Sequence, residues 1–460
     1  MKNEATGQQI QVMHTACTTL HPSVTLSCRY AGDFVDLQWK VATLSAKIEM
    51  EKGAARKETR SSTASTSHAC CREGIVMVIY PKLLVSAYAS IRAIRALNCT
   101  LPVELWYVES EMVSIRGTSL LDGVPQTLRQ EYGPISLQPI ADARVADFNS
   151  KVYAVIHSKF EYVLYLDADN VPVKDPSCLF RSREFLQMGA IFWPDFWHPA
   201  HTIFRIDEGS MLWELLDMPY IDMFEQESGQ FAIDKTRSSA ALRMLSLLAF
   251  HEPNLFSRYK LVHGDKDLFR LAWLKTGTPF HMVSNPPSIA GTVRETKFCG
   301  MTMVQFDTDG EVLFLHRNSK KLTGGLDVDR NPDKLIWTHL QHFRYRAASP
   351  HDLVEAAFVV SKPIRLPNDQ TGSAHVSADN LNIPYDVLRK MYTVSIFAGA
   401  PEFADTQWCY GQSTLTTTWC ELIAWQDTMF PEVENGLLHY ASEAVALLPA
   451  SAIELIVQSN

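Results

Sequence analysis

The sequence predicts an α/β protein with a mixed, mostly parallel central sheet that is flanked by helices. Short apolar runs at 75–80, 103–108 and 162–166 have the length of strands. Segments with apolar residues at helical spacing separate them, as at 84–94 and 149–159. The chain has 460 residues, 46% of them hydrophobic and 20% charged, which is an ordinary globular balance. Strands that alternate with helices in this way build a sheet that is covered on both faces.

The predicted elements follow one another from Gly74 to His316. Gly277 suits the residue after a helix C-terminus, because glycine tolerates the left-handed conformation there. In chain order we expect strands at 75–80 and 103–108, a helix at 149–159, strands at 162–166, 190–193 and 231–233, helices at 240–250 and 268–275, and a strand at 311–316.

The chain divides into three predicted parts. Residues 1–69 are expected to form a flexible leader and linker, since 51–68 are polar and rich in Ser and Thr, and 34–48 show only a weak helical pattern. Residues 70–347 are predicted to be the catalytic domain. Residues 348–460 are predicted to be a C-terminal extension of unknown role, because they begin with Pro-, Gly- and polar-rich sequence.

Charge and targeting signals narrow the function classes. The net charge of −9 and the pI near 5.9 argue against a nucleic-acid binder or a binder of anionic membranes. No apolar run approaches the roughly 18 residues of a membrane span, so we expect membrane attachment only through an anchor that this sequence does not show. The nine cysteines lack metal-ligand spacing and predict no disulfide framework. Cys409 and Cys420 are a candidate disulfide pair, but isolated reduced cysteines are the favoured interpretation.

Two aspartates, Asp167 and Asp169, directly follow the apolar strand 162–166. Residues two apart in a strand point the same way and lie about 6.5 Å apart, so both carboxylates can approach one site. A divalent cation removes the repulsion between them in a desolvated cleft. Oxygen ligands with open positions suit Mg²⁺ or Mn²⁺ bound to a diphosphate, and ligands of α/β sheets bind at the carboxyl ends of strands. The pattern therefore predicts a metal site.

Two other interpretations fit the same residues. The aspartates can simply end the strand and begin a turn toward Pro172 and Pro176. An apolar strand followed by D-x-D-x-V also fits a haloacid-dehalogenase-like phosphatase, with Asp167 as nucleophile and Asp169 as acid and base. That class places the motif near the start of its domain, whereas ordered sequence from Gly74 onward precedes it here, so the phosphatase ranks second.

Five stretches, taken together and in order, resemble one family. They are YLDADNVPVKDP (165–176), GAIFWPDFW (189–197), ESGQFAIDK (227–235), HGDKDLFRLAW (263–273) and QFDTDGEVLFLHRN (305–318). Over about residues 74–345 the chain resembles the fungal-type α-mannosyltransferases of the Golgi. The resemblance implies a GT-A glycosyltransferase fold, GDP-mannose as donor, Mn²⁺ (or Mg²⁺) as the metal and retention of the α-anomer. It also implies a type II membrane protein with its catalytic part in the Golgi lumen.

The strand at 311–316 and the helix before the DxD pair supply further candidates for this site. His316 is a candidate third metal ligand beside Asp167 and Asp169, although a histidine at a strand end is usually an ordinary surface residue. Lys320 is a candidate for the donor diphosphate, together with its neighbours Arg317 and Lys321, unless this cluster is a solvated loop. The resemblance places a lysine such as Lys151 near the nucleotide, whereas a helix lysine normally faces solvent.

Three acidic residues are the catalytic candidates. Asp195 stands among aromatic residues that suit a sugar-binding cleft, with a core strand as the alternative. Glu227 precedes Gln230, and both can bind sugar hydroxyls, with a solvated turn as the alternative. Asp265 is favoured over Asp267 for the cleft, and one of these two aspartates is expected to cap the following helix.

The sequence thus predicts a metal-dependent retaining α-mannosyltransferase that uses GDP-mannose and a glycan or glycoprotein acceptor. Acceptor attack from the leaving-group face requires no dedicated base, because a diphosphate oxygen takes the proton. In a covalent route, Glu227 or Asp265 is the nucleophile candidate. An inactive scaffold that binds sugar or nucleotide is the non-enzyme alternative. The linkage, the acceptor and the oligomeric state are not encoded in any pattern of the sequence.

Overall fold

A computed structural model describes most of the chain. The described residues are 30–58, 72–326 (except 114–116, 118 and 146), 334–343, 392–398, 408–413 and 420–453 (except 451), with a few isolated positions at 21, 23, 24, 403 and 406.

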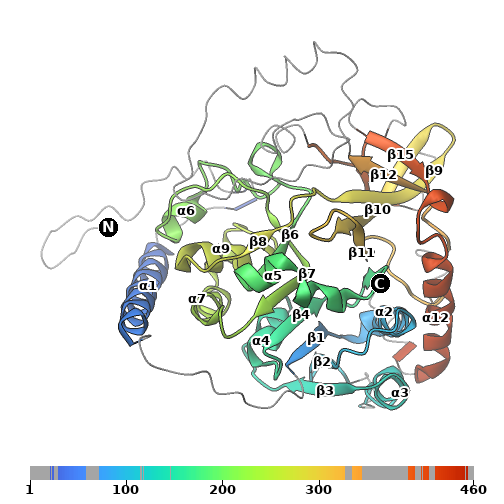
Figure 1. The fold of residues 1–460 in the computed structure, drawn as a ribbon, viewed down its shortest axis with the longest axis horizontal. Coiled ribbons are helices and arrows are strands. Elements are labelled where there is room, and N and C mark those ends of the chain that lie inside the picture. The colour runs from blue at the N-terminus through green and yellow to red at the C-terminus, as the bar shows by residue number, and fades with distance from the viewer. Residues whose placement is uncertain are drawn as a thin grey trace, which may run out of the picture.

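Within these residues, seven strands form the first sheet, in the order β3-β2-β1-β4-β7-β6-β8 (Figure 1). Neighbouring strands from β3 to β4 are parallel, β7 is antiparallel to both β4 and β6, and β8 is parallel to β6. The predicted α/β class with a mixed, mostly parallel sheet is therefore confirmed. The strands are β1 (Glu73–Val78), β2 (Val103–Val108), β3 (Ile135–Ile140), β4 (Tyr162–Leu166), β6 (Ala190–Pro194), β7 (Gln226–Asp234) and β8 (His281–Met282).

Helices cover both faces of this sheet. On β1, Ile75 and Met77 point into one apolar core and Val76 into another, as the two-residue period of a strand requires. The first core contains α2 (Leu84–Ala96), α3 (Val124–Glu131) and α5 (Arg183–Met188). The second contains α4 (Asn149–His157), α6 (Met211–Leu215), α7 (Ser239–Phe250), α8 (Leu255–Arg258) and α9 (Lys266–Thr276). Gly277 ends α9 with φ of 60°, as the sequence predicts.

A second sheet packs against the first and holds the later strands. Within the described residues its order is β13-β14-β10-β9-β12-β15, while β11 pairs with β10 and with the short β5. The strands are β5 (Asn170–Pro172), β9 (Ser288–Arg294), β10 (Lys297–Phe306), β11 (Val312–His316), β12 (His339–Phe343), β13 (Ser395–Ala398), β14 (Trp408–Gly411) and β15 (Cys420–Ala424). Because β5 directly follows the DxD pair, this second sheet is joined to the first at that point.

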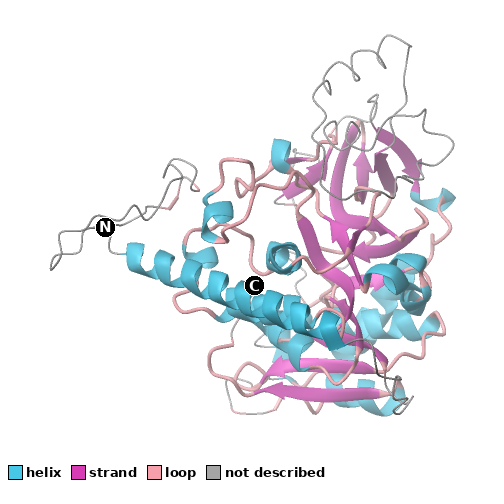
Figure 2. Cartoon of the chain, turned by 60° about the vertical axis from the view of Figure 1, so that its left-hand side comes forward, coloured by secondary structure: helices cyan, strands magenta, loops and turns pink. Residues whose placement is uncertain are grey.

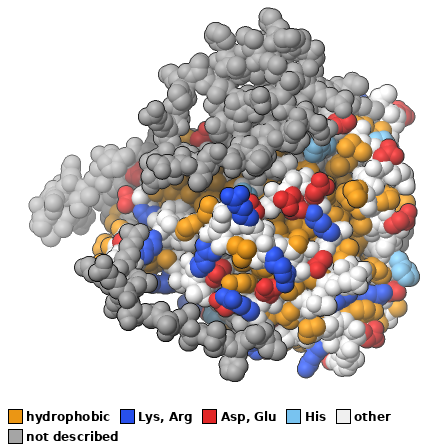
Figure 3. Space-filling model, viewed as in Figure 1, with side chains coloured by type: hydrophobic (Ala, Val, Ile, Leu, Met, Phe, Trp, Pro, Cys, Tyr) orange, Lys and Arg blue, Asp and Glu red, His pale blue; other side chains and the backbone are white. Residues whose placement is uncertain are grey.

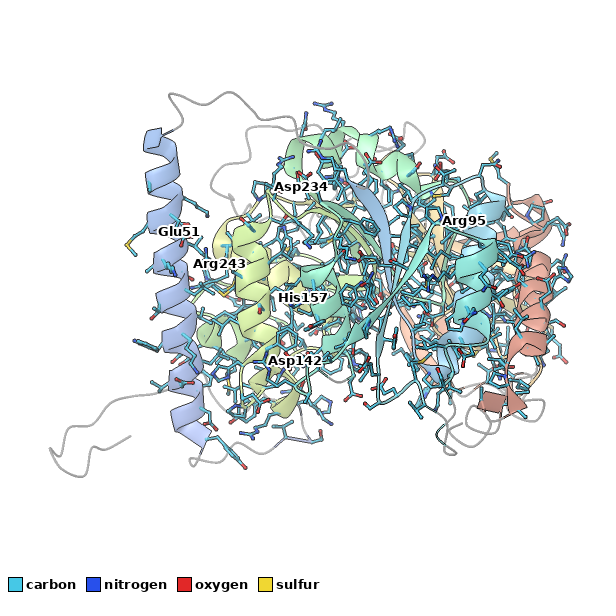
Figure 4. All side chains as sticks on the ribbon, turned by 90° about the horizontal axis from the view of Figure 1, so that it is seen from below. Glu51, Arg95, Asp142, His157, Asp234 and Arg243 are labelled. Carbon is cyan, nitrogen blue, oxygen red and sulfur yellow. A yellow bond between two sulfur atoms is a disulfide. The ribbon has the colours of Figure 1, made fainter. Side chains whose placement is uncertain are left out.

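The N-terminal region differs from the expected leader. Residues Ala31–Glu58 form a helix, α1, that lies along α7 on the outside of the domain (Figures 2 and 4). Phe34, Leu37 and Val41 are buried in the second apolar core, and Glu51 pairs with Arg243 of α7. The weak helical pattern noted in the sequence is thus a packed helix, because a helix that touches the core along one narrow line needs few apolar residues.

The C-terminal region is continuous with the rest of the fold. Helix α12 (Val433–Leu447) packs on α2, and β14 and β15 are strands of the second sheet (Figure 1). Cys409 of β14 forms a disulfide with Cys299 of β10 and not with Cys420. The expectation of isolated reduced cysteines is therefore wrong for this pair, and so is the alternative pairing of Cys409 with Cys420. The bounds of the three predicted parts stay a prediction.

Among the described residues, no helix combines the length and the apolar character that crossing a membrane requires. On the face shown in Figure 3, acidic and basic side chains are interspersed.

Candidate functional site

Three segments meet at the carboxyl end of β4. Asp167 directly follows β4, and its backbone N–H donates to the carbonyl of Gly229 in the neighbouring β7 at 2.8 Å. Asn170 of β5 is paired with His316 at the end of β11. The sheet register therefore carries Asp167, Asp169 and His316 to one place although His316 is distant from the other two in sequence.

The three predicted metal ligands lie together. Each of Asp167, Asp169 and His316 offers one ligand atom, and these three atoms all lie within 4.8 Å of one another. Two carboxylates and an imidazole are a donor set that suits Mn²⁺ or Mg²⁺. The buried Nδ1 atom of His316 accepts no hydrogen bond from the described residues, and the buried Oδ1 of Asn170 accepts none either. These residues fit a divalent cation in their chemistry and their spacing.

Positive groups surround the buried Asp169. Its carboxylate forms an ion pair with Lys321, and its Oδ1 lies 3.4 Å from Nε2 of His316. Burial by itself would raise the pKa of Asp169, but Lys321 and His316 outweigh it and hold this pKa well below its usual range. Burial likewise opposes charge on His316, yet Asp169 and Glu227 raise its pKa above the ordinary value. Asp169 is thus an anion that requires a cation beside it.

Lys151 links Asp167 to the start of α9. Its ammonium lies 3.3 Å from Asp167 Oδ1 and 3.4 Å from Asp265 Oδ2, and it donates to the carbonyl and the hydroxyl of Ser228. Burial would lower the pKa of Lys151, but the nearby carboxylates, Asp167 first, raise it above its usual value. Tyr165 donates its hydroxyl to Asp167 Oδ1 at 2.8 Å. These contacts fix the direction of the Asp167 carboxylate.

Asp265 is at the N-cap position of α9 but makes no side-chain capping bond. Burial raises its pKa to about 6, and Lys151 opposes this rise. Asp267, in the first turn of the helix, accepts from the backbone N–H of Gln226 and from the guanidinium of Arg270. The expected side-chain cap is therefore absent at both of these described aspartates, because each one pairs with a neighbouring cation instead.

The stretch from Glu227 to Gln230 lies against His316. Glu227 Oε1 accepts from the N–H of Gly229 at 2.6 Å and lies 3.7 Å from His316 Nδ1. A Cβ atom on Gly229 would lie 2.7 Å from the His316 ring, so only glycine leaves room for this imidazole. The side-chain oxygen of Gln230 accepts from Asn170. Glu227 and Gln230 therefore adjoin the predicted metal ligands.

Two predicted residues have other surroundings. Asp195 is buried, accepts from the N–H of Phe196 and forms an ion pair with Lys266, so its carboxylate is engaged inside the protein. Lys320 offers its backbone carbonyl to the guanidinium of Arg317, whereas it is the neighbouring Lys321 whose ammonium contacts Asp169.

Sequence reasoning missed four residues of this site or of its surroundings. Tyr165 lies in β4 two residues before Asp167, which directly follows the strand, and this two-residue spacing is a signal that the sequence contains. Asn170 and Ser228 adjoin predicted residues, but their roles depend on contacts between distant segments, since Asn170 donates to Gly229 of β7 and Ser228 accepts from Lys151 of α4. Glu434, which pairs with Arg317, carries no local signal at all.

Comparisons of the sequence with known proteins find similarity to mannosyltransferases. A family model of mannosyltransferases (Mannosyl_trans3) matches residues 72–307, just over half of the chain. The α-1,2-mannosyltransferase MNN2 of Saccharomyces cerevisiae is 26% identical over 269 residues, which cover 51% of this chain and 45% of that protein. The α-1,2-mannosyltransferase MNN23 of Candida albicans is 24% identical over 285 residues, with 51% and 45% covered. The chain spans about half the length of the curated relatives it matches.

Solved structures offer a weaker likeness. The galactosyltransferase LgtC has a TM-score of 0.32 at 14% identity, with 46% of this chain and 73% of that chain covered. Mouse xyloside xylosyltransferase 1 has a TM-score of 0.31 at 17% identity, with 46% and 84% covered. These scores are too low to support any argument about this chain.

Proposed function

The chain belongs to the mannosyltransferase family whose model spans residues 72–307, and from this premise we propose that it transfers a mannosyl residue from GDP-mannose to a glycan or glycoprotein acceptor. The observation that carries the proposal is the meeting of Asp167, Asp169 and His316 at the carboxyl end of β4, where a GT-A enzyme binds its donor. Family membership favours this reaction over the phosphatase alternative, and the complete ligand set favours an enzyme over an inactive scaffold.

Asp167, Asp169 and His316 would hold Mn²⁺ or Mg²⁺ in this proposal. When bound, the cation would neutralise charge on the leaving diphosphate, as a Lewis acid does. Tyr165 and Lys151 hold the Asp167 carboxylate in a fixed direction, so its orientation is set before any ligand arrives. That preorganisation lowers the entropy lost on binding.

The side chains around this centre have distinct proposed roles. Lys321 supplies a second positive charge at Asp169 and is the basic residue best placed for a donor diphosphate. Asp265 and Glu227 are proposed to bind hydroxyls of the donor sugar or of the acceptor. Asp195, which is buried in its pair with Lys266, is proposed to act by positioning α9.

The proposed transfer retains the α-anomer. The acceptor oxygen forms a bond to the anomeric carbon on the face from which the diphosphate leaves, and the acceptor proton passes to a diphosphate oxygen. No side chain need remove that proton. In the covalent alternative, the carboxylate of Glu227 or Asp265 would attack the anomeric carbon from the opposite face as the diphosphate leaves, and the acceptor oxygen would then displace that carboxylate. Asp265 is the less available of the two near neutral pH, because Lys151 engages its carboxylate.

We further propose that the catalytic part lies in the Golgi lumen. The disulfide between Cys299 and Cys409 supports this compartment, since such bonds persist under oxidising conditions. Asn98 begins an acceptor triplet for N-glycosylation, Asn98-Cys99-Thr100, and the structure exposes both Asn98 and Thr100.

A thermal-shift experiment tests the proposed function. GDP and UDP are added to the protein with Mn²⁺, with Mg²⁺ and with EDTA. We expect GDP to stabilise the protein only with a metal, by about 2.7 kcal/mol when GDP is at 100 times its dissociation constant. Asp169→Ala should abolish that shift.

Asp142→Ala is the matched control, because Asp142 pairs with Arg144 at the surface. It should leave the GDP shift unchanged. A GDP shift of equal size in EDTA, or in Asp169→Ala, would refute the metal site. A second assay follows the release of GDP from GDP-mannose. Nucleotide binding without turnover of GDP-mannose or any UDP-sugar, with and without acceptor glycans, would favour the scaffold.

A further inference from the structure

A buried ion pair joins the C-terminal helix to the residue that follows His316. The guanidinium of Arg317 donates to Oε1 of Glu434 in α12 at 2.9 Å. Both side chains are almost fully buried, with exposed fractions of 4% and 1%. His316, Arg317 and Glu434 all lie beyond residues 72–307, so the family match assigns none of them a role.

The carboxylate of Glu434 is shared between two chain segments. Besides Arg317, it accepts from the backbone N–H groups of Ile336 and Trp337, each at 2.9 Å. A carboxylate taken out of water costs several kcal/mol unless its oxygens are paired, and three donors meet that requirement here. Buried ion pairs contribute little net stability compared with apolar packing, so a role in specifying geometry fits this pair better than a role in stability.

Arg317 is tied to the candidate metal site on its other side. Its backbone N–H donates to the carbonyl of Asp169 at 3.0 Å, and its Nε donates to the carbonyl of Lys320 at 2.6 Å. The turn that begins at Arg317 ends at Lys321, whose ammonium contacts the Asp169 carboxylate. Arg317 thus hydrogen-bonds to the backbone of Asp169 and to the backbone of Lys320, and Glu434 fixes the position of its guanidinium.

We propose that Glu434 is a positioning residue for the candidate metal site. Through Arg317 it fixes the backbone directly after His316 and the turn to Lys321, so that both side chains keep their places against Asp169. The C-terminal helix is then part of the catalytic unit rather than an accessory. This inference rests on the proposed function insofar as the site takes a metal and a diphosphate.

The same helix offers a matched control. Glu443, more than two turns further along α12, forms an ion pair with Arg92 of α2. Both ion pairs attach α12 to the body of the protein. Among the described residues, however, the contacts of Glu443 lead to α2 and to His439, and none leads to the turn after β11. Loss of this pair loosens α12 without touching the site.

The test compares Glu434→Gln with Glu443→Gln in the full chain. Mn²⁺ dissociation constants are measured by electron paramagnetic resonance without nucleotide, and hydrogen exchange is followed in peptides covering residues 313–323. We expect Glu434→Gln to weaken Mn²⁺ binding by about tenfold or more, as loss of outer-shell support does. Amide exchange in the turn should accelerate at least about tenfold, while Glu443→Gln should stay within about twofold of wild type in both measurements.

Each outcome decides the proposal. Equal effects of the two variants, or a Glu434→Gln protein that matches wild type, would overturn it. If Glu434→Gln does not fold, Arg317→Lys replaces it, since lysine keeps the charge but cannot reach Glu434 and the Lys320 carbonyl as a fork. Arg317→Lys should then show the same tenfold losses, and wild-type values would overturn the proposal. Wild-type protein that binds no Mn²⁺ would refute the proposed function, and hydrogen exchange would still decide whether Glu434 holds the turn.

Discussion

Gly229 is the position where a single added methyl group should separate metal binding from folding. It lies in β7, where the strand passes under the imidazole of His316. A Cβ atom there would lie 2.7 Å from Cε1 and from Nδ1 of His316, and 3.1 Å from Oε1 of Glu227. Gly229→Ala therefore pushes the ring away from its place beside Asp169.

The size of the effect follows from these distances. Ordinary van der Waals contact begins at 3.4 Å, so the ring must retreat by 3.4 − 2.7 = 0.7 Å at least. Metal ligands keep their distances to within about 0.2 Å, so the displaced imidazole no longer completes the site. We expect Mn²⁺ affinity to fall about 10- to 100-fold, which is about 1.4–2.7 kcal/mol. Folding should lose about 1–3 kcal/mol through overpacking.

The assay pairs a Mn²⁺ titration, read by electron paramagnetic resonance, with urea unfolding. Gly74→Ala is the control. Gly74 lies in β1, a strand that contributes none of the three candidate ligands, and a Cβ atom there would lie 2.3 Å from the ring of Phe160. It should lose stability of the same order and keep its Mn²⁺ affinity. A Gly229→Ala protein with wild-type Mn²⁺ affinity would refute the reasoning, and so would a Gly74→Ala protein that loses affinity equally.

Three further predictions concern the disulfide, a buried carboxyl group and the basic residue at the metal site. Replacing Cys299 and Cys409 by serine should lower the free energy of unfolding, measured in urea, by about 5 kcal/mol for a closed loop of 110 residues, and an unchanged value would contradict the bond. Burial raises the pKa of Glu225 to about 8, above its value of 4.5 in an unfolded chain, so wild type should lose stability as the pH rises from 4.5 to 8. The free energy of unfolding of Glu225→Gln should rise relative to that of wild type by at most about 5 kcal/mol over that range. A difference between the two proteins that does not change with pH would contradict the raised pKa. Lys321→Met should bind GDP about tenfold more weakly at saturating Mn²⁺, because the ammonium proposed to face the diphosphate is missing, so calorimetry that finds an unchanged GDP affinity would exclude this role.

The strands and helices of the first sheet follow from local sequence. Period-two and 3.6-residue patterns depend on neighbours a few positions apart, so β1, β2, β4 and α9 lie within about two residues of where the sequence predicts them. The DxD pair is equally local, although the extended geometry expected for it is not observed: both aspartates lie in the short turn between β4 and β5. Helix α1 buries only a narrow line of side chains, so its apolar residues give a helical pattern too weak to predict a packed helix.

Sequence alone therefore determined the fold class, the acidic pair and, through resemblance, the family. Only the tertiary structure decided that His316 joins that pair, that Lys321 rather than Lys320 contacts Asp169, that Cys409 bonds Cys299, and that Glu434 holds Arg317. These contacts join segments that are far apart along the chain. Which segments meet is set by strand order and register across two sheets, and no local pattern of residues records that register.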